Sequence, residues 1–431
     1  MGNVPAPAPG SSFIRYWTAA AISSFGSAVT AVAMPVLVVQ LLRATPFEVG
    51  AVNAAQLVPY AVLGLIAGVY TDRWRRKPIL VWASVGRALS LGAIPLLWLT
   101  GVLQVWMLVI ALLLFGAFSV FGFAATQSLL PRLVPRAKLV SANARLDQAD
   151  AAAQTLGPAI GGGLAGLLGA PVAIAVDAIS YLVDAALNSS IPVHEPRPDS
   201  RTRNLRAEIR DGLQRTYRHR TLGPLAASTH IWFVANGAAM TVLPLFALRS
   251  LGFTAFTYGL LLAAFGVASL AGASTAPRIG ARLGSGRAII LARVAYPIAW
   301  LLVAVASPTA AGDAFLFVAL PLQGLAAGTE NSNEMGYWQA LTPDEFLGRV
   351  NATRRSANRT MAALGALVAG LMVGLIGDRP TLIGVIIAFT AAALTAGLSP
   401  LRAAPGKDDP RPSGQQDGQA AAPHQGPGAA A

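Results

Sequence analysis

The chain has 431 residues, of which 54% are hydrophobic and only 12% are charged, and its mean hydropathy is +0.56. Soluble globular domains carry about 25% charged residues, so this composition excludes an ordinary soluble domain and indicates a membrane protein. The net charge of +13 is compatible with a nucleic-acid partner. Cysteine is absent, which excludes disulfide bonds and thiolate metal sites.

Apolar blocks long enough to cross a bilayer follow one another along almost the whole sequence. A helix needs about 20 residues to cross. Twelve such blocks cover residues 13–41, 47–71, 78–100, 104–130, 145–168, 171–192, 222–248, 254–276, 287–306, 314–338, 353–376 and 380–399. The sequence therefore predicts an all-α membrane protein with twelve transmembrane helices, joined mostly by short connections between antiparallel neighbours.

Polar segments divide the chain into two six-helix halves, 13–192 and 222–401. Residues 1–12 form a Pro-containing lead that we expect to be flexible, and the first block lacks a small-residue cleavage site, so we interpret it as a retained helix. The linker 193–221 is strongly basic, and we expect it to be partly helical at the membrane surface. The tail 402–431 lacks the apolar content to fold and is expected to be disordered.

The basic residues are concentrated on one side of the predicted membrane. With the N-terminus in the cytoplasm, 27 of the 32 Lys and Arg residues fall in cytoplasmic segments and three fall outside. The other two, Arg87 and Arg293, lie within spans near the cytoplasmic side, where we expect them to reach toward the interface. This positive-inside pattern predicts a multi-pass protein of the cell membrane with both termini in the cytoplasm. The charge thus indicates contact with anionic lipid, and no nucleic-acid partner is expected.

The two halves also share residues at a nearly fixed offset. Pro135 and Asn143 recur 208 residues later as Pro343 and Asn351. A second set recurs after 209 residues: Pro35, Phe47, Gly50 and Arg73 match Pro244, Phe256, Gly259 and Arg282. A period of half the chain indicates duplication of a large unit rather than a solenoid. Because each half has an even number of spans, an axis along the membrane normal is expected to relate the two copies.

A signature motif lies between the second and third spans. Gly68, Asp72, Arg73, Arg76 and Lys77 are spaced as G-x-x-x-D-R-x-x-R-[RK]. The glycine permits close helix approach, and the charged groups suit helix ends and their carbonyl oxygens. The stretch resembles the signature of the major facilitator superfamily. This resemblance implies a clamp that ties the two halves together in the outward-facing state; a plain positive-inside loop is the alternative.

A run of small residues marks the fifth span at Gly157, Pro158, Gly161 and Gly162. Such residues let helices approach closely, and the proline kinks the span. The run resembles the antiporter motif of major facilitator exporters, although Ala153 replaces its upstream glycine. The resemblance favours export, and ordinary small-residue packing is the alternative.

The repeated pattern L-x-P-x7-N-A, with Asp177 and Tyr181 in the sixth span, is similar to the branch that holds bacterial macrolide-efflux proteins and the enterobactin exporter. The resemblance covers nearly the whole chain apart from its tails. Many members of that branch carry an acid after the glycine of the first span, whereas Ser27 follows Gly26 here. The resemblance therefore implies no proton-coupling residue in the first span of this chain.

Four acids, Asp177, Asp184, Glu330 and Glu334, fall within the sixth and tenth predicted spans. An ionisable group in hydrocarbon costs about 2.5–3.5 kcal/mol on insertion scales, so each is a candidate for function. We expect Asp184 to be the leading candidate for proton or substrate binding, followed by Glu330 and Asp177; a structural hydrogen bond is the alternative for Asp177. Glu334 is expected to form an interface ion pair, with Arg349 or Arg73 as its partner.

The sequence predicts a secondary active transporter that exports a small hydrophobic or amphipathic molecule, such as a drug, antibiotic, siderophore or metabolite. We expect a monomer that works by proton antiport and alternating access, with lipid, protons and substrate as partners and with no metal or cofactor. An uncoupled or inward-directed facilitator, a channel and a multi-span enzyme are the alternatives. The chain has no H-E-x-x-H, G-x-S-x-G or phosphate-cradling G-x-x-x-x-G-K-[ST] motif, which disfavours the enzyme and ATP drive.

Overall fold

The computed structural model describes residues 9–193 and 205–402, and its elements are helices. The first group consists of α1 (Pro9–Val36) with its extension η1 (Leu37–Leu41), α2 (Pro46–Ala55), α3 (Val58–Arg73), α4 (Arg76–Leu99), α5 (Val105–Leu133), η2 (Arg136–Lys138), α6 (Leu139–Leu168) and α7 (Ala170–Ser189). The later elements are α8 (Leu205–Arg218), α9 (Leu222–Pro244) with its extension η3 (Leu245–Ser250), α10 (Ala255–Leu283), α11 (Ser285–Val305), α12 (Ala310–Leu341), α13 (Asp344–Ile376), α14 (Asp378–Gly397) and η4 (Pro400–Arg402).

Within the described part of the chain, ten helices are long and apolar enough to cross a membrane. The α2–α3 segment and α6 are not among them. The predicted second span, 47–71, is broken near Gln56, because Pro59 has no backbone N–H to continue the ladder of α2. The predicted fifth span, 145–168, begins earlier than expected, since α6 starts at Leu139 with several polar turns.

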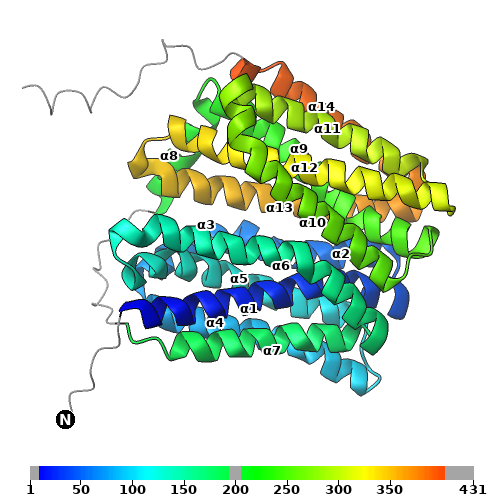
Figure 1. Cartoon of the computed structure of the whole chain (residues 1–431), viewed down its shortest axis with the longest axis horizontal. Coiled ribbons are helices and arrows are strands. Elements are labelled where there is room, and N and C mark those ends of the chain that lie inside the picture. Colours follow the sequence, from blue (N-terminus) through cyan, green and yellow to red (C-terminus); the bar gives the residue numbers. More distant parts are fainter. Residues whose placement is uncertain (1–8, 194–204, 403–431) are drawn as a thin grey trace, which may run out of the picture.

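The helices form two groups that lie one above the other in Figure 1, with α1–α7 below and α9–α14 above. In the first group, α1 packs against α6 and α7, and α4 packs against α5 and α7. In the second group, α9 packs against α13 and α14, and α11 packs against α12 and α14. The same set of neighbours therefore recurs, as expected if the repeated residues belong to a duplicated unit.

The linker helix α8 lies at the end of the molecule where α1 begins (Figure 1), and it packs against α9 and α13. We call this the linker end, and the opposite end the far end. Most of the predicted lead (1–12) and almost all of the predicted tail (402–431) lie outside the described residues.

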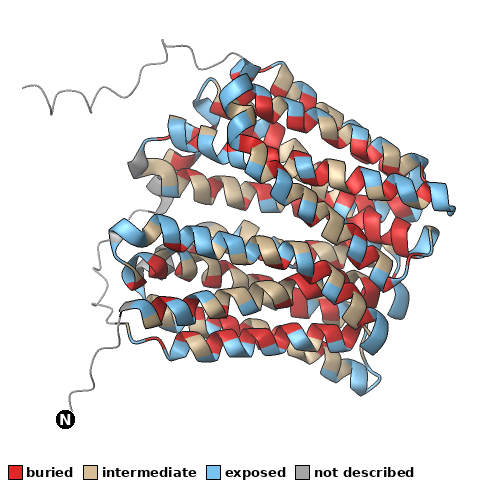
Figure 2. Ribbon diagram, in the orientation of Figure 1, coloured by how far each residue is buried: buried red, intermediate tan, exposed pale blue. Residues whose placement is uncertain are grey.

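The two groups meet closely toward the far end, where Figure 2 shows buried residues gathered on the right of the view. Gly50 of α2 approaches Gly370 of α13, and a Cβ on Gly50 would come 3.2 Å from the Gly370 Cα. Polar side chains reinforce the junction: Arg249 donates a hydrogen bond of 2.7 Å to the Ala44 carbonyl, and Gln40 donates one of 3.1 Å to that of Phe253. The far end is therefore closed by contacts that reach the backbone.

Candidate functional site

The residues of the signature motif lie on two helix ends rather than in a loop. Gly68, Asp72 and Arg73 belong to the last turns of α3, and Arg76 and Lys77 open α4. The side chains of the first three lie outside the described residues. Lys77 Nζ donates a hydrogen bond of 2.7 Å to the carbonyl of Ile191, just beyond the end of α7. This is the kind of helix-end contact that the motif predicts, whereas a clamp between the two groups stays a prediction.

The small-residue run of α6 faces two helices. Gly157 and Gly161 pack against α1, and a Cβ on Gly161 would come 2.8 Å from the Val29 Cα. Gly162 packs against α10 of the other group, where a Cβ would come 2.6 Å from the Ala255 carbonyl oxygen and 3.0 Å from the Gly259 Cα. The run therefore holds one group together and also forms part of the junction between the groups.

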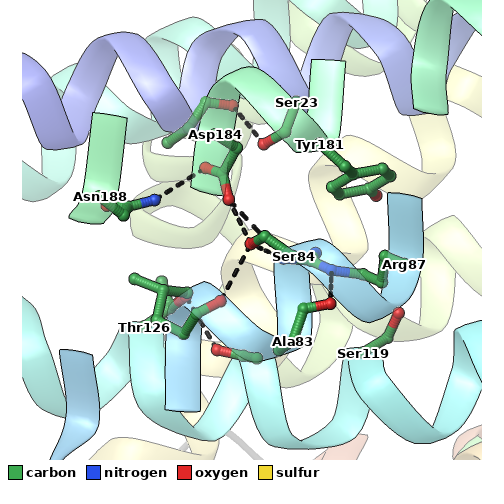
Figure 3. Close-up of polar contacts among 12 residues, drawn as sticks. Ser23, Ala83, Ser84, Arg87, Ser119, Thr126, Tyr181, Asp184 and Asn188 are labelled. Atoms are coloured by element: carbon green, nitrogen blue, oxygen red, sulfur yellow. Dashed lines mark hydrogen bonds and ion pairs between the residues drawn. The ribbon is translucent and has the colours of Figure 1, made fainter. Parts of the chain in front are cut away.

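Asp184 of α7 is buried in a polar cluster with α4, shown in Figure 3. Asn188 donates a hydrogen bond of 3.0 Å to its Oδ1, and the Ser84 hydroxyl donates to its Oδ2. Arg87 Nη2 lies 3.9 Å from the same oxygen and donates a hydrogen bond of 2.9 Å to Ser84. Ser84 thus bridges the acid and the arginine, and every polar atom of the Asp184 carboxylate has a partner.

Arg87 points inward, whereas its place near the end of a predicted span indicated that it would reach toward the membrane interface. Its side chain is only 16% exposed, and its guanidinium carbon lies 4.3 Å from the centre of the Tyr181 ring. The Tyr181 hydroxyl in turn lies 2.7 Å from Oγ of Ser27 on α1. The position at which the resembling branch often carries an acid therefore contacts the Asp184 cluster through Tyr181.

Asp177 lies on the same helix as Asp184 but faces α1. Asp177 is 1% exposed, and a Cβ on Gly26 of α1 would lie 2.5 Å from its Oδ1. The Ser180 hydroxyl donates a hydrogen bond of 3.1 Å to Oδ1, and Oδ2 has no hydrogen-bond partner among the described residues. Asp177 fills a tight helix contact, which fits the structural alternative for this residue, and it carries no ion pair in the described part of the chain.

A second charged cluster lies within the other group, around Arg293 of α11. Its Nε donates a hydrogen bond of 2.8 Å to Glu330, and its Nη2 donates one of 3.1 Å to Glu334. Arg354 of α13 donates one of 2.6 Å to the other oxygen of Glu334. Two arginines and two glutamates thus form a network of balanced charge, as buried ion pairs require.

This network corrects two expectations. Arg293 is fully buried, at 0% exposure, and does not reach the interface. Glu334 pairs with Arg293 and Arg354, whereas Arg349 lies 3.6 Å from Asp211 on α8. Arg354 was not among the partners expected from the sequence. Its position could have indicated this pairing, because Arg354 lies at the start of the eleventh predicted span and Glu334 lies near the end of the tenth, on the same side of the membrane.

Buried charge clusters inside bundles of membrane-crossing helices, and two groups of helices with recurring packing, are features of secondary transporters. The fold and its clusters therefore define a multi-span membrane transporter. Residues 4–422 match the family described as transmembrane secretion effectors, and the chain belongs to this family of major facilitator transporters. The resemblance drawn from the signature motif is confirmed at the level of the superfamily.

The chain is similar to curated transporters over much of its length. It is 32% identical over 267 residues to an uncharacterized major-facilitator-type transporter, y4rN, of Sinorhizobium fredii, a match that covers 61% of this chain and 64% of the relative. It is 26% identical over 354 residues to the multi-drug resistance efflux pump PmrA of Streptococcus pneumoniae, covering 79% of this chain and 82% of the relative.

Solved structures of transporters share the fold. The nucleoside transporter NupG superposes with a TM-score of 0.74 at 12% identity, covering 90% of this chain and 98% of that structure. A bacterial homologue of the lysosomal transporter Spinster, in an inward-facing and unoccupied conformation, superposes with a TM-score of 0.69 at 15% identity, covering 92% of this chain and 97% of that structure. At these identities the likeness shows the fold alone.

Proposed function

We propose that the chain is a secondary transporter that exports a small hydrophobic or amphipathic molecule across the cell membrane by proton antiport. The observation that carries the proposal is the buried Asp184–Ser84–Arg87 cluster between α7 and α4. The small-residue run of α6 and the similarity to an efflux pump support export as the direction. The substrate belongs to the broad range of drugs, antibiotics, siderophores and metabolites.

Twelve spans arranged in two halves follow if α6 and the α2–α3 segment also cross the membrane. α6 has 30 residues, and α2 and α3 together cover the distance in two pieces. The concentration of Lys and Arg residues then places the linker end in the cytoplasm. With this orientation, the closed far end is the outer side.

In this proposal the proton binds to Asp184 from the outside. The carboxylate is charged when Arg87, Ser84 and Asn188 hold it, and protonation releases Arg87 from its counter-charge. Antiport requires that proton and substrate each prefer a different state. The change of state would separate the contact between Gly162 and Gly259 at the far end. Asp177 and Glu330 are the second-rank candidates for the proton.

A facilitator without proton coupling is the second candidate function. Ser27 supports it, because it stands where the resembling branch often carries an acid. Under this reading the Asp184 cluster only holds α4 and α7 together.

A drug and metabolite panel in a pump-deficient bacterial host tests the export function. Expression of the chain should lower the accumulation of at least one compound, and an uncoupler of the proton gradient should restore it. Unchanged accumulation of every compound, with the protein present in the membrane, would contradict export. A facilitator predicts instead that entry and exit of a compound become faster while its final level in the cell stays unchanged.

A further inference from the structure

Two arginines of α13, Arg355 and Arg359, face aromatic rings of the first group of helices. The guanidinium carbon of Arg355 lies 3.5 Å from the centre of the Phe123 ring on α5, and that of Arg359 lies 5.7 Å from the Tyr60 ring on α3. Among the side chains that the structure describes, neither arginine forms an ion pair. Each cation therefore contacts an aromatic face of the opposite group and has no ion-pair partner among the described side chains there.

The phase of α13 shows where these arginines point. Asn358 faces α9, since its side-chain oxygen lies 2.8 Å from His230, and Ser356 faces α3, since its hydroxyl donates a hydrogen bond of 2.7 Å to the Tyr60 carbonyl. At about 100° per residue, Arg355 and Arg359 fall on the stripe between these two faces. They therefore point toward the region that α3, α5 and α9 surround, rather than toward lipid.

Their depth also separates them from ordinary interfacial cations. Arg355 and Arg359 follow the first residue of α13 by 11 and 15 positions, which corresponds to about 16 and 22 Å along the helix axis. Arg355 is half-buried and Arg359 is exposed, so both are accessible. A cation that only anchors a helix would reach for lipid headgroups instead of rings on another helix group.

Charge balance sets the pair apart from the three arginines that are paired with acids inside the helix groups. Arg87 has Asp184, Arg293 has Glu330, and Arg354 has Glu334. Arg355 and Arg359 also repel each other, because residues four apart on a helix are neighbours. An uncompensated pair of positive charges beside two aromatic rings is the arrangement that binds an aromatic anion, since guanidinium groups favour carboxylate, phosphate and sulfonate oxygens.

We propose that the exported molecule is an anion with an aromatic or apolar body, that Arg355 and Arg359 hold its charged group, and that Phe123 and Tyr60 contact its body. That the bound anion is the exported molecule rests on the proposed transport function, but binding of an anion at this site can be measured without transport. The proposal names the substrate class and leaves the direction and the coupling to separate experiments.

The test uses two fluorescent probes that share a ring system and differ in charge. The anion 8-anilinonaphthalene-1-sulfonate carries a sulfonate, and N-phenyl-1-naphthylamine is its neutral counterpart. The full chain is placed in phosphatidylcholine nanodiscs without any gradient, and probe emission is excited through tryptophan, with empty nanodiscs as background. In the double variant Arg355→Gln/Arg359→Gln, the Kd for the anionic probe should rise by about tenfold or more, because charge-assisted hydrogen bonds are lost.

The neutral probe and a matched variant serve as controls. The Kd for the neutral probe should change less than about twofold, which also shows that the double variant is folded. Arg287→Gln removes one positive charge from the exposed start of α11, a helix whose main contacts lie within the second group, and should leave both affinities unchanged. An unchanged Kd for the anion in the double variant, or an equal loss for both probes, would overturn the proposal.

Salt dependence keeps the proposal testable if the double variant does not fold. In the unmodified chain, the Kd for the anionic probe should rise with sodium chloride while that for the neutral probe stays constant. Salt independence of both would overturn the proposal.

An anionic lipid headgroup is the other source of the same chemistry. Nanodiscs that contain phosphatidylglycerol distinguish a lipid headgroup from a soluble anion. The double variant in the same nanodiscs shows how much the negative surface charge alone weakens binding of the anionic probe. If phosphatidylglycerol weakens anion binding to the unmodified chain no more than to the variant, the site takes a soluble anion. A larger effect on the unmodified chain would assign the arginines to lipid and overturn the proposal. A failure of export or proton coupling would leave all of these affinities unchanged, so the two proposals fail separately.

Discussion

The guanidinium group of Arg87 lies 3.9 Å from the carboxylate of Asp184, and its counterpart in the second group finds its acid on a different helix. Arg293, 206 residues later, pairs with Glu330 of α12 at 2.8 Å instead of with α14. The residue 208 positions before Glu330 is Gly122, and a Cβ there would come 3.4 Å from Arg87 Nη2. The duplicated scaffold thus keeps an arginine in both groups, while the acid that neutralises it has moved.

Replacing Asp184 by Asn should abolish uphill, proton-driven export while leaving downhill exchange of substrate intact. The amide resembles the protonated acid in shape and cannot release a proton. We expect the initial rate of concentrative export to fall at least about tenfold, measured against counterflow in the same proteoliposomes. Asp147→Asn makes the same change on an exposed face of α6 and should behave like the unmodified chain. Concentrative export by Asp184→Asn at the unmodified rate would remove Asp184 from the coupling mechanism.

Replacing Gly162 by Ala should impair transport, whereas Gly163→Ala should not. A Cβ at residue 162 would come 2.6 Å from the Ala255 carbonyl, and one at residue 163 meets nothing within 4 Å. The larger side chain would push α6 and α10 apart and hinder closure of the far end. We expect a severalfold lower transport rate at equal expression for the first variant alone. Equal rates in the two variants would show that the close approach of α6 and α10 is dispensable.

Replacing Arg293 by Met should destabilise the protein, because it leaves Glu330 buried without its partner. Breaking one side of a buried ion pair costs about 3–5 kcal/mol, while replacing both members by apolar residues is often close to neutral. The melting temperature in detergent should therefore fall clearly for Arg293→Met and by less for Arg293→Met/Glu330→Met. The exposed Arg287→Met supplies the control. A double variant less stable than the single one would contradict the proposed charge balance.

The membrane fold could be predicted from the sequence because hydropathy acts locally. Stretches of apolar residues must cross as helices, and positive residues must stay on one side. Hydropathy did not predict the break near Gln56, because the apolar residues continue on both sides of Pro59, which ends the helix. The sequence also indicated Arg349 or Arg73 as the partner of Glu334 and did not indicate Arg354, because the phase of α13 decides which of its arginines faces the acid.

The candidate site was predicted in part for a related reason. An acid stands out in an apolar sequence, so the burial of Asp184 and Glu330 could be predicted without knowledge of their neighbours, and their roles stay predictions. Arginines were assigned to the interface by a general tendency, and this misplaced Arg87 and Arg293. Packing between helices decides whether such a side chain turns inward, and that packing depends on contacts between residues far apart in the sequence.

Proton movement coupled to substrate in everted membrane vesicles tests the central claim most directly. The vesicles are energised to acidify their interior, and each compound from the efflux panel is added while a pH-sensitive dye reports the gradient. Proton antiport predicts that a transported compound partly dissipates the gradient in vesicles with the unmodified chain and not in vesicles with Asp184→Asn. Transport of the compound with no change in the gradient, or an equal change in both kinds of vesicle, would contradict it.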